Sequence, residues 1–180
     1  ATGGSVDNNR QARKGNLDAW LTHALTAYDN WNGVGVFKDQ KPFKSIRLLS
    51  GVYENQHHFV ALEKSGIKTM DDLKDKKVVM GSAGSGGAVN SENILRSIGL
   101  WDSVAPQYLT WSEGGRALTD GQVDAMGASS APAPVVVTAK ALHKINLLEM
   151  SDAQFDMVLK KFPSYIRSAI PAGTYKSVQK

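Results

Sequence analysis

A glycine-rich turn at residues 81–87 has the composition best suited to binding a ligand. A short apolar stretch precedes the turn and a helical pattern follows it. Glycine lets the backbone approach a ligand closely, and the unpaired amides and dipole at the start of a helix favour a negative charge. The turn therefore predicts an anion site, with a purely structural glycine turn as the alternative. Its glycines and serines are Gly81, Ser82, Gly84, Ser85, Gly86 and Gly87.

The residues around the turn argue against a nucleotide. A phosphate-binding Walker loop ends in Gly-Lys-Ser/Thr. Here Ala88 follows the glycines, and no lysine occurs between Gly87 and Lys140. A dinucleotide fingerprint requires glycine or alanine where Val89 stands. A carboxylate is smaller and needs only two or three donors, so a small organic anion fits the turn better. The predicted donors are the backbone amides of Ser85, Gly86 and Gly87 and the hydroxyl of Ser85.

Residues for catalysis or metal binding are sparse. The 180 residues include no cysteine, so a thiol nucleophile is excluded, and no Gly-x-Ser-x-Gly elbow occurs. His57 and His58 are adjacent rather than four residues apart, which does not match a zinc-binding helix, and His23 and His143 stand alone. We therefore predict no catalytic residue, no metal site and no cofactor. Each histidine is expected to make a polar contact or to lie at the surface.

Composition and charge indicate an ordinary folded protein. A chain of 180 residues with 42% hydrophobic residues can bury a core without disulfides, and no apolar run reaches the roughly 18 residues of a membrane span. The net charge of +4 comes from 21 basic and 17 acidic residues, which are intermixed. Only Arg10, Arg13 and Lys14 form a basic cluster, which we interpret as a solvated helix face. Nucleic acid is therefore not an expected partner.

Helical and strand patterns alternate along the chain, which predicts an α/β fold with mainly parallel strand pairing. Ser5, Thr69, Ser112 and Ser151 are predicted helix caps, and residues 1–4 resemble the end of a strand entering a turn. The expected helices cover 5–15, 24–31, 70–73, the segment after the turn to 98, 112–121, 133–142 and 151–162. The expected strands cover 17–22, 46–52, 59–62, 77–80, 107–110, 123–126 and 145–148.

A short near-repeat suggests two similar lobes. Residues 15–19 and 121–125 share the pattern Gly-x-(Leu/Val)-Asp-Ala, each after a predicted helix and each opening a predicted strand. The strands end in small polar residues, Thr22 in the first copy and Ser129 and Ser130 in the second. Ligands of open α/β sheets bind beyond the carboxyl ends of strands, so two facing lobes would enclose one cleft. Two ordinary helix-stop glycines before strands are the alternative.

Seven segments of the chain resemble, in the same order, the TAXI family of solute receptors of TRAP transporters. No single segment is specific, but the order is, and the segments extend over essentially the whole chain. They are ATGGSVDN (1–8), AYDNWNG (27–33), SGIKTMDDLK (65–74), GSAGSG (81–86), DGQVDA (120–125), APAP (131–134) and IPAGTY (170–175).

The resemblance implies a type II periplasmic binding protein, in which two α/β lobes joined by hinge strands close on a ligand. Lobe one would comprise residues 1–64 and 149–180, lobe two residues 65–148, and strands near 59–62 and 145–148 would cross between them. Family members are longer at both ends, so the first lobe is expected to be incomplete here and a signal peptide removed or absent.

The resemblance also implies a function outside the cytoplasm. The receptor would capture a carboxylate such as glutamate or 2-oxoglutarate in the periplasm and deliver it to a TRAP membrane permease. An interaction protein or surface antigen with an empty cleft, and an enzyme on the same scaffold, are the alternatives.

Two positions depart from the family pattern. The family usually has threonine where Gly87 stands, and usually Gln-x-Asp near Thr22 and His23, so the ligand is expected to differ accordingly. His23 would supply a donor or line the cleft. Ser129 and Ser130 would line the facing edge. Tyr53 would offer a ring and a hydroxyl, with simple packing as its alternative role.

Overall fold

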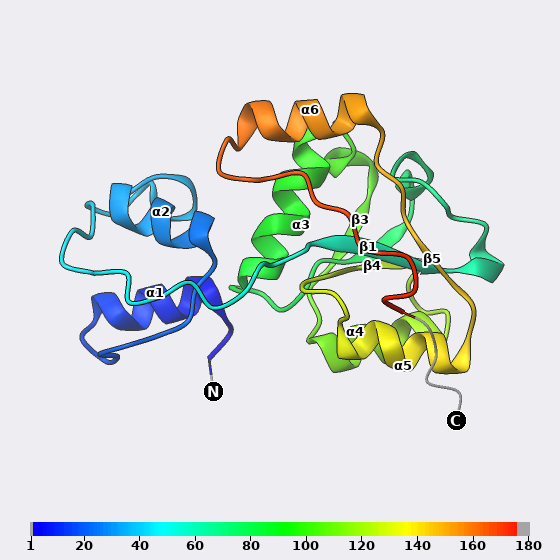
Figure 1. Ribbon diagram of the computed structural model, residues 1–180, viewed down its shortest axis with the longest axis horizontal. Coiled ribbons are helices and arrows are strands. Elements are labelled where there is room, and N and C mark those ends of the chain that lie inside the picture. Colours follow the sequence, from blue (N-terminus) through cyan, green and yellow to red (C-terminus); the bar gives the residue numbers. More distant parts are fainter. Residues whose placement is uncertain (1, 176–180) are drawn as a thin grey trace. The chain divides into compact units, whose positions relative to one another are not determined.

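The structure is a computed structural model that describes residues 2–175, and the chain divides into two compact units (Figure 1). The helical unit comprises the residues up to Glu54 together with residues 84–86. The sheet unit comprises residues 55–83 and the chain from Gly87 onward. Ala1, part of the predicted strand end at residues 1–4, lies outside the described residues. The predicted lobe boundaries remain a prediction.

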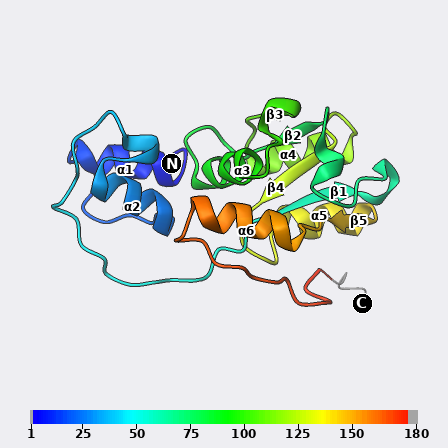
Figure 2. The ribbon, with the colours of Figure 1, turned by 90° about the horizontal axis from the view of Figure 1, so that it is seen from above.

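Two helices form the helical unit and lie side by side, α1 (Ser5–Arg13) and α2 (Ala24–Asn32) (Figure 2). Buried asparagines join them, because Asn30 Nδ2 donates to Asn9 Oδ1 over 2.8 Å. Arg13 Nε donates to Asn30 Oδ1 over 2.5 Å and its guanidinium lies over the ring of Phe37. Of the predicted basic cluster, Arg13 is therefore a packing residue, while Arg10 and Lys14 are exposed. A short 3-10 helix, Gly35–Phe37, follows α2.

Two strands predicted for this unit do not form. Residues 17–22 and 46–52 have no ladder partner among residues 2–175, and a strand exists only where a neighbouring backbone accepts and donates its hydrogen bonds. Apolar composition alone predicted both strands. As a result, Leu48 and Leu49 on the second segment are 89% and 85% exposed. The first copy of the near-repeat thus opens no strand, whereas β4 follows the second.

The sheet unit contains one five-stranded sheet with the order β3-β2-β4-β1-β5. Strand β2 pairs in parallel with both β3 and β4, whereas β1 is antiparallel to both β4 and β5. The predicted α/β class is confirmed, but the expected parallel pairing holds only for the β3-β2-β4 half. The strands are β1 (His58–Leu62), β2 (Lys77–Val79), β3 (Ala105–Gln107), β4 (Ala125–Ala128) and β5 (Ile145–Leu147).

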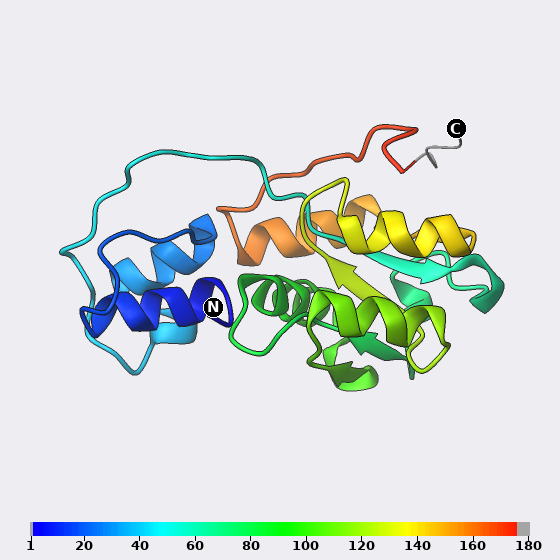
Figure 3. The ribbon, with the colours of Figure 1, turned by 90° about the horizontal axis from the view of Figure 1, so that it is seen from below.

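Helices cover both faces of this sheet. Helices α3 (Gly86–Ser97, of which Gly86 belongs to the helical unit) and α6 (Asp152–Lys161) pack on one face (Figure 1). Helices α4 (Trp111–Thr119) and α5 (Pro134–Leu142) lie side by side on the other (Figure 3). Alternate residues of β1 point to opposite faces, so Phe59 joins the α3 core and Val60 the α4 core.

Capping residues explain where two helices, α4 and α6, begin. Ser151 caps α6 as predicted, but the cap of α4 is Thr110 rather than Ser112, because Glu113 completes a capping box with Thr110. Before the 3-10 helix Asp71–Leu73, the carboxylate of Asp72 accepts from Thr69, so Thr69 is not the cap. Two more 3-10 helices are Glu63–Ser65 and Trp101–Ser103. Within residues 2–175, no helix is both long and apolar enough to cross a membrane.

Candidate functional site

The predicted ligand residues fall into two groups, because the unit boundary divides the glycine-rich turn before Gly87. Thr22, His23, Ser85 and Gly86 belong to the helical unit. Gly87, Ser129 and Ser130 belong to the sheet unit, whose β2 leads into the turn and whose β4 ends just before Ser129.

In the helical unit, the turn packs closely against the start of α1. The amides of Val6 and Asp7 both donate to the carbonyl oxygen of Gly84, over 3.2 and 3.3 Å. A Cβ atom on Gly4 would lie 3.1 Å from the Cα and Cβ atoms of Ser85. These contacts use the first amides of α1 inside the protein, so that helix start is not available to a bound anion.

His23 lies directly on the turn, beside Gly86. Its ring occupies the space beside the Gly86 Cα, since a Cβ there would collide with His23 Nδ1. Burial lowers the pKa of His23, and a hydrogen bond with the Gly86 backbone partly opposes that shift. A neutral imidazole is therefore favoured at pH 7, with one nitrogen donor and one acceptor. Neighbouring Thr22 accepts from Asn9 Nδ2 over 2.8 Å.

In the sheet unit, Gly87 at the start of α3 lies beside the end of β4. A Cβ on Gly87 would lie 2.9 Å from Trp111 Cζ2 and 3.2 Å from Ser129 Oγ. Only glycine fits this close approach, so a threonine at position 87 would collide with the Trp111 ring. The sequence did not predict that Trp111 contacts Gly87. Trp111 is the first residue of α4, and this position places its ring beside Gly87.

Ser129 and Ser130 differ in what holds them. Ser130 has a φ of 62°, in the left-handed region, and its amide donates to Asn55 Oδ1 over 3.0 Å. The Ser130 hydroxyl donates to the Ser129 carbonyl over 2.6 Å, so it is bonded to the local backbone. Ser129 Oγ instead lies 3.1 Å from His57 Nδ1. Of the two predicted serines, Ser129 has its hydroxyl joined to a side-chain network.

The sequence did not predict that His57 and Ser91 join this group. His57 was expected to make a polar contact, and it does, to hydroxyls on both sides of its ring. Ser91 is one turn along α3 from Gly87 and is fully buried. The helical spacing could have indicated Ser91, because positions four apart on a helix share a face, and Ser91 is a polar residue on the same face as Gly87. Tyr53 is 71% exposed and so is not part of the core of its unit.

The family of the chain follows from its whole length, since residues 1–180 match the model of the NMT1-like family. The chain belongs to the NMT1-like family. Its likeness to the TAXI receptors is a finer assignment that the family match leaves as a proposal.

Several solved structures similar to this NMT1-like chain are of solute-binding proteins. The aliphatic sulphonate binding protein SsuA from Escherichia coli is 30% identical over 52% of this chain and 31% of its own, with a TM-score of 0.44. SsuA from Xanthomonas axonopodis pv. citri, bound to MOPS, is 26% identical over the same shares, with a TM-score of 0.44. The arginine-bound ArgBP from T. maritima is 18% identical over 61% of this chain and 54% of its own, with a TM-score of 0.41. The chain thus spans about a third of the SsuA proteins and about half of ArgBP.

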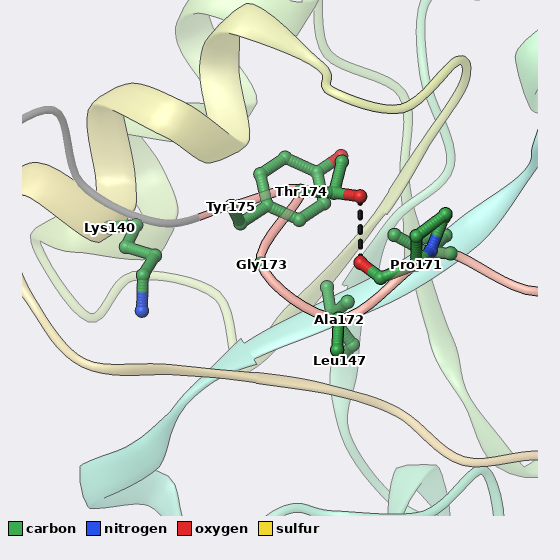
Figure 4. Close-up of a pocket in the computed structure, with 8 residues that line it drawn as sticks. Lys140, Leu147, Pro171, Ala172, Gly173, Thr174 and Tyr175 are labelled. Atoms are coloured by element: carbon green, nitrogen blue, oxygen red, sulfur yellow. Dashed lines mark hydrogen bonds between the residues drawn. The ribbon is translucent and has the colours of Figure 1, made fainter.

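The NMT1-like chain also has an open pocket of about 470 Å³, and none of the predicted ligand residues lines it (Figure 4). Lys140, Leu147 and residues 170–175 line it, and Thr174 Oγ1 donates to the Pro171 carbonyl over 2.7 Å. Polar groups do not converge on it from several elements, so we do not assign the ligand site there. Residues 2–175 also contain no group of three or more His, Cys, Asp or Glu side chains placed to hold a metal.

Proposed function

We propose that this protein is an extracytoplasmic solute-binding receptor of the TAXI kind that captures a small organic anion for a TRAP membrane permease. The proposed ligand is a carboxylate, of which glutamate and 2-oxoglutarate are the first examples to test. The proposal includes no catalytic step and no cofactor.

The contact between Gly87 and Ser129 carries this proposal. It joins the start of α3 to the carboxyl end of β4, which is the edge of an α/β sheet where ligands bind. The Trp111 ring and Ser129 Oγ pack closely on Gly87, and we propose that the Gly87 amide, near the start of α3, donates to the anion. A helix start beside a hydroxyl suits an anion oxygen, which accepts hydrogen bonds from both.

The charges of the proposed site residues are compatible with a small anion as the ligand. None of Gly87, Ser91, His57, Ser129 and Ser130 carries a carboxylate, so the sheet-unit group has no fixed negative charge that would repel one. In the helical unit, taken by itself, the His23 ring lies beside Gly86, and neither His23 nor Ser85 carries a carboxylate. The group lacks the several adjacent basic residues that a phosphate chain requires.

The test is thermal stabilisation of the purified chain by L-glutamate and by 2-oxoglutarate. We expect a saturable rise in the unfolding temperature with at least one of them, because a ligand that binds only the folded state stabilises it. Ser85→Trp, which fills the turn, should abolish the shift. Ser112→Trp, at an exposed position of α4, should retain it and serves as the matched control.

Native mass spectrometry of the freshly purified protein addresses the alternatives. A co-purified organic acid that is released on unfolding would support the receptor. Absence of any bound small molecule, together with no thermal shift from either anion, would contradict it and favour an interaction protein. Conversion of either anion by the protein alone would instead indicate an enzyme.

A further inference from the structure

The imidazole of His57 is held between two serine hydroxyls in the sheet unit. His57 Nδ1 lies 3.1 Å from Ser129 Oγ and His57 Nε2 lies 3.0 Å from Ser91 Oγ. Ser91 is fully buried and His57 and Ser129 are half-buried. The predicted anion site included Ser129 but gave no role to His57.

The hydrogen-bond directions follow from the one hydrogen that each hydroxyl carries. The Ser91 hydroxyl donates to the carbonyl oxygen of Met80 over 3.0 Å, so Ser91 Oγ can only accept from His57. His57 Nε2 must therefore carry a hydrogen. In the neutral ring Nδ1 is then an acceptor, and the hydrogen between it and Ser129 belongs to the serine.

Packing keeps the ring in this orientation. A Cβ on Gly127 would lie 2.5 Å from Ser91 Oγ and 3.3 Å from His57 Nε2, so β4 closes one side of the network. The ring of Phe59 meets that of His57 edge-on, with centroids 5.4 Å apart and an interplanar angle of 83°. Rotation of the imidazole would break both serine contacts at once.

The charge on His57 then decides what Ser129 can offer a solute. While His57 is neutral, the Ser129 hydrogen is used on Nδ1 and its oxygen presents lone pairs, which repel an anion oxygen. When His57 takes up a proton, Nδ1–H donates to Ser129 Oγ, and the serine hydrogen is free to turn toward the solute. The added positive charge favours an anion as well.

We propose that His57 is a positioning residue that sets Ser129 as an acceptor or a donor, so that protonation of His57 strengthens the binding of an anion beside Ser129. This inference rests on the proposed function, since it assumes that a solute reaches Ser129.

Several other titratable groups of the packed elements have contacts of their own. His58, the next residue on β1, bonds to Gln56 O and Tyr175 Oη. On α3, Glu92 and Arg96 pair with each other over 2.8 Å at the surface. At the start of β2, the amide of Lys77 donates to Asp124 Oδ2, at the opposite end of the strands. The groups bonded to or stacked on His57 in these contacts are uncharged, namely Ser91, Ser129 and Phe59.

Nitrogen NMR of the histidine rings tests the hydrogen-bond assignment without any ligand. We expect neutral His57 to be protonated at Nε2 and to accept at Nδ1. Ser129→Ala should move the Nδ1 resonance toward that of an unbonded nitrogen and leave Nε2 unchanged. Hydrogen on Nδ1 of the neutral ring, or an Nδ1 resonance that ignores Ser129→Ala, would overturn the proposal whether or not a solute binds.

Titration with 2-oxoglutarate at several pH values tests the consequence. Between pH 8 and pH 5.5 we expect the affinity of the unmodified protein to rise about tenfold, the effect of a one-unit difference in pKa between free and bound states. In His57→Gln, which cannot be charged at position 57, the rise in affinity should be clearly smaller than in the unmodified protein. His143→Gln should keep the full rise.

Equal pH dependence in His57→Gln and the unmodified protein would refute the coupling. If 2-oxoglutarate and L-glutamate fail to bind at every pH, the proposed function fails, and the coupling fails with it. The NMR experiment still decides separately whether His57 orients Ser129, so the two failures are distinguishable.

Discussion

At the residue scale, His58 shows how burial and hydrogen bonding select one charge state. His58 Nδ1 lies 3.0 Å from the carbonyl of Gln56, so Nδ1 carries the hydrogen, and Nε2 accepts from the Tyr175 hydroxyl over 2.8 Å. The Tyr175 oxygen in turn accepts from the Ala133 amide over 2.9 Å. Protonation of His58 would place a second donor against Tyr175. The chain of bonds thus requires a neutral ring.

A pH dependence of stability follows from that requirement. Burial lowers the pKa of His58 from its ordinary 6.5, an effect that its hydrogen bond to Gln56 partly opposes. The unfolded state therefore binds more protons just below pH 6.5, and the free energy of unfolding should fall as pH decreases from 6.5 through the folded-state pKa. Each unit of pKa difference is equivalent to about 1.4 kcal/mol. Urea unfolding between pH 7.5 and pH 5 measures this decrease.

Matched variants separate His58 from other groups. His58→Gln should flatten part of the pH dependence, and the remainder is expected from His23, whose pKa burial also lowers. The carboxylates of Asp72 and Glu113, whose pKa values are lowered by hydrogen bonds from Lys68 and Thr110 respectively, act only at lower pH. Parallel profiles for His58→Gln and the unmodified protein would show that His58 is not the titrating group.

At the element scale, glycines in α4 set how closely that helix approaches its neighbours. A Cβ on Gly114 would lie 2.9 Å from Val79 Cγ1 of β2, and one on Gly115 would collide with Val135 Cγ2 of α5. Glycine is a poor helix former, costing roughly 1 kcal/mol relative to alanine inside a helix. Two adjacent glycines in α4 are therefore explained by packing and not by helix propensity.

Gly115→Ala should accordingly destabilise the protein despite its higher helix propensity. Overpacking of a close contact costs about 1–3 kcal/mol, and the branched Val135 side chain has little freedom to move away. We expect a net loss of about 1 kcal/mol in the free energy of unfolding, measured by urea denaturation. The control is Ser112→Ala, at an exposed position of the same helix. A more stable Gly115→Ala variant would show that the contact with Val135 is loose.

At the scale of the whole molecule, residues 44–54 form a long exposed segment between regular elements. They form no helix or strand, and Leu48, Leu49 and Tyr53 lie open to solvent. Among residues 2–175, the Arg47 side chain donates to two nearby carbonyls, those of Lys44 and Ile46. Backbone without ladder bonds or burial opens at little cost in free energy.

Limited trypsin digestion should therefore cut first after Lys44 or Arg47. Arg96 and Arg116 lie in helices, where cleavage requires local unfolding, and should be cut much later. Mass spectrometry of the early fragments identifies the site, and Arg47→Gln should remove its own cut while leaving the order of the others. A first cut within α3 or α4 would contradict the exposure of residues 44–54.

Most of the secondary structure could be predicted from the sequence, because the local signals are strong. The apolar runs that became β1 and β2, the Ser151 cap of α6 and the glycine-rich turn before α3 all depend on residues near one another in the chain. The two failed strands, 17–22 and 46–52, have the same apolar character but depend on a partner far away in sequence. A strand forms only when a second strand pairs with its backbone, and the composition of one segment does not show whether such a partner exists.

The sequence by itself determined the α/β class and the lack of a thiol nucleophile, since these follow from residue types and short spacings, and it predicts an anion site at residues 81–87. Only the tertiary structure decided that β1 runs antiparallel between β4 and β5, that Trp111 closes on Gly87, and that His57 bridges Ser91 and Ser129. Each of these contacts joins residues separated by 24 or more positions, and the direction of a hydrogen bond depends on every partner of both atoms. Such relations exist only after the chain has folded.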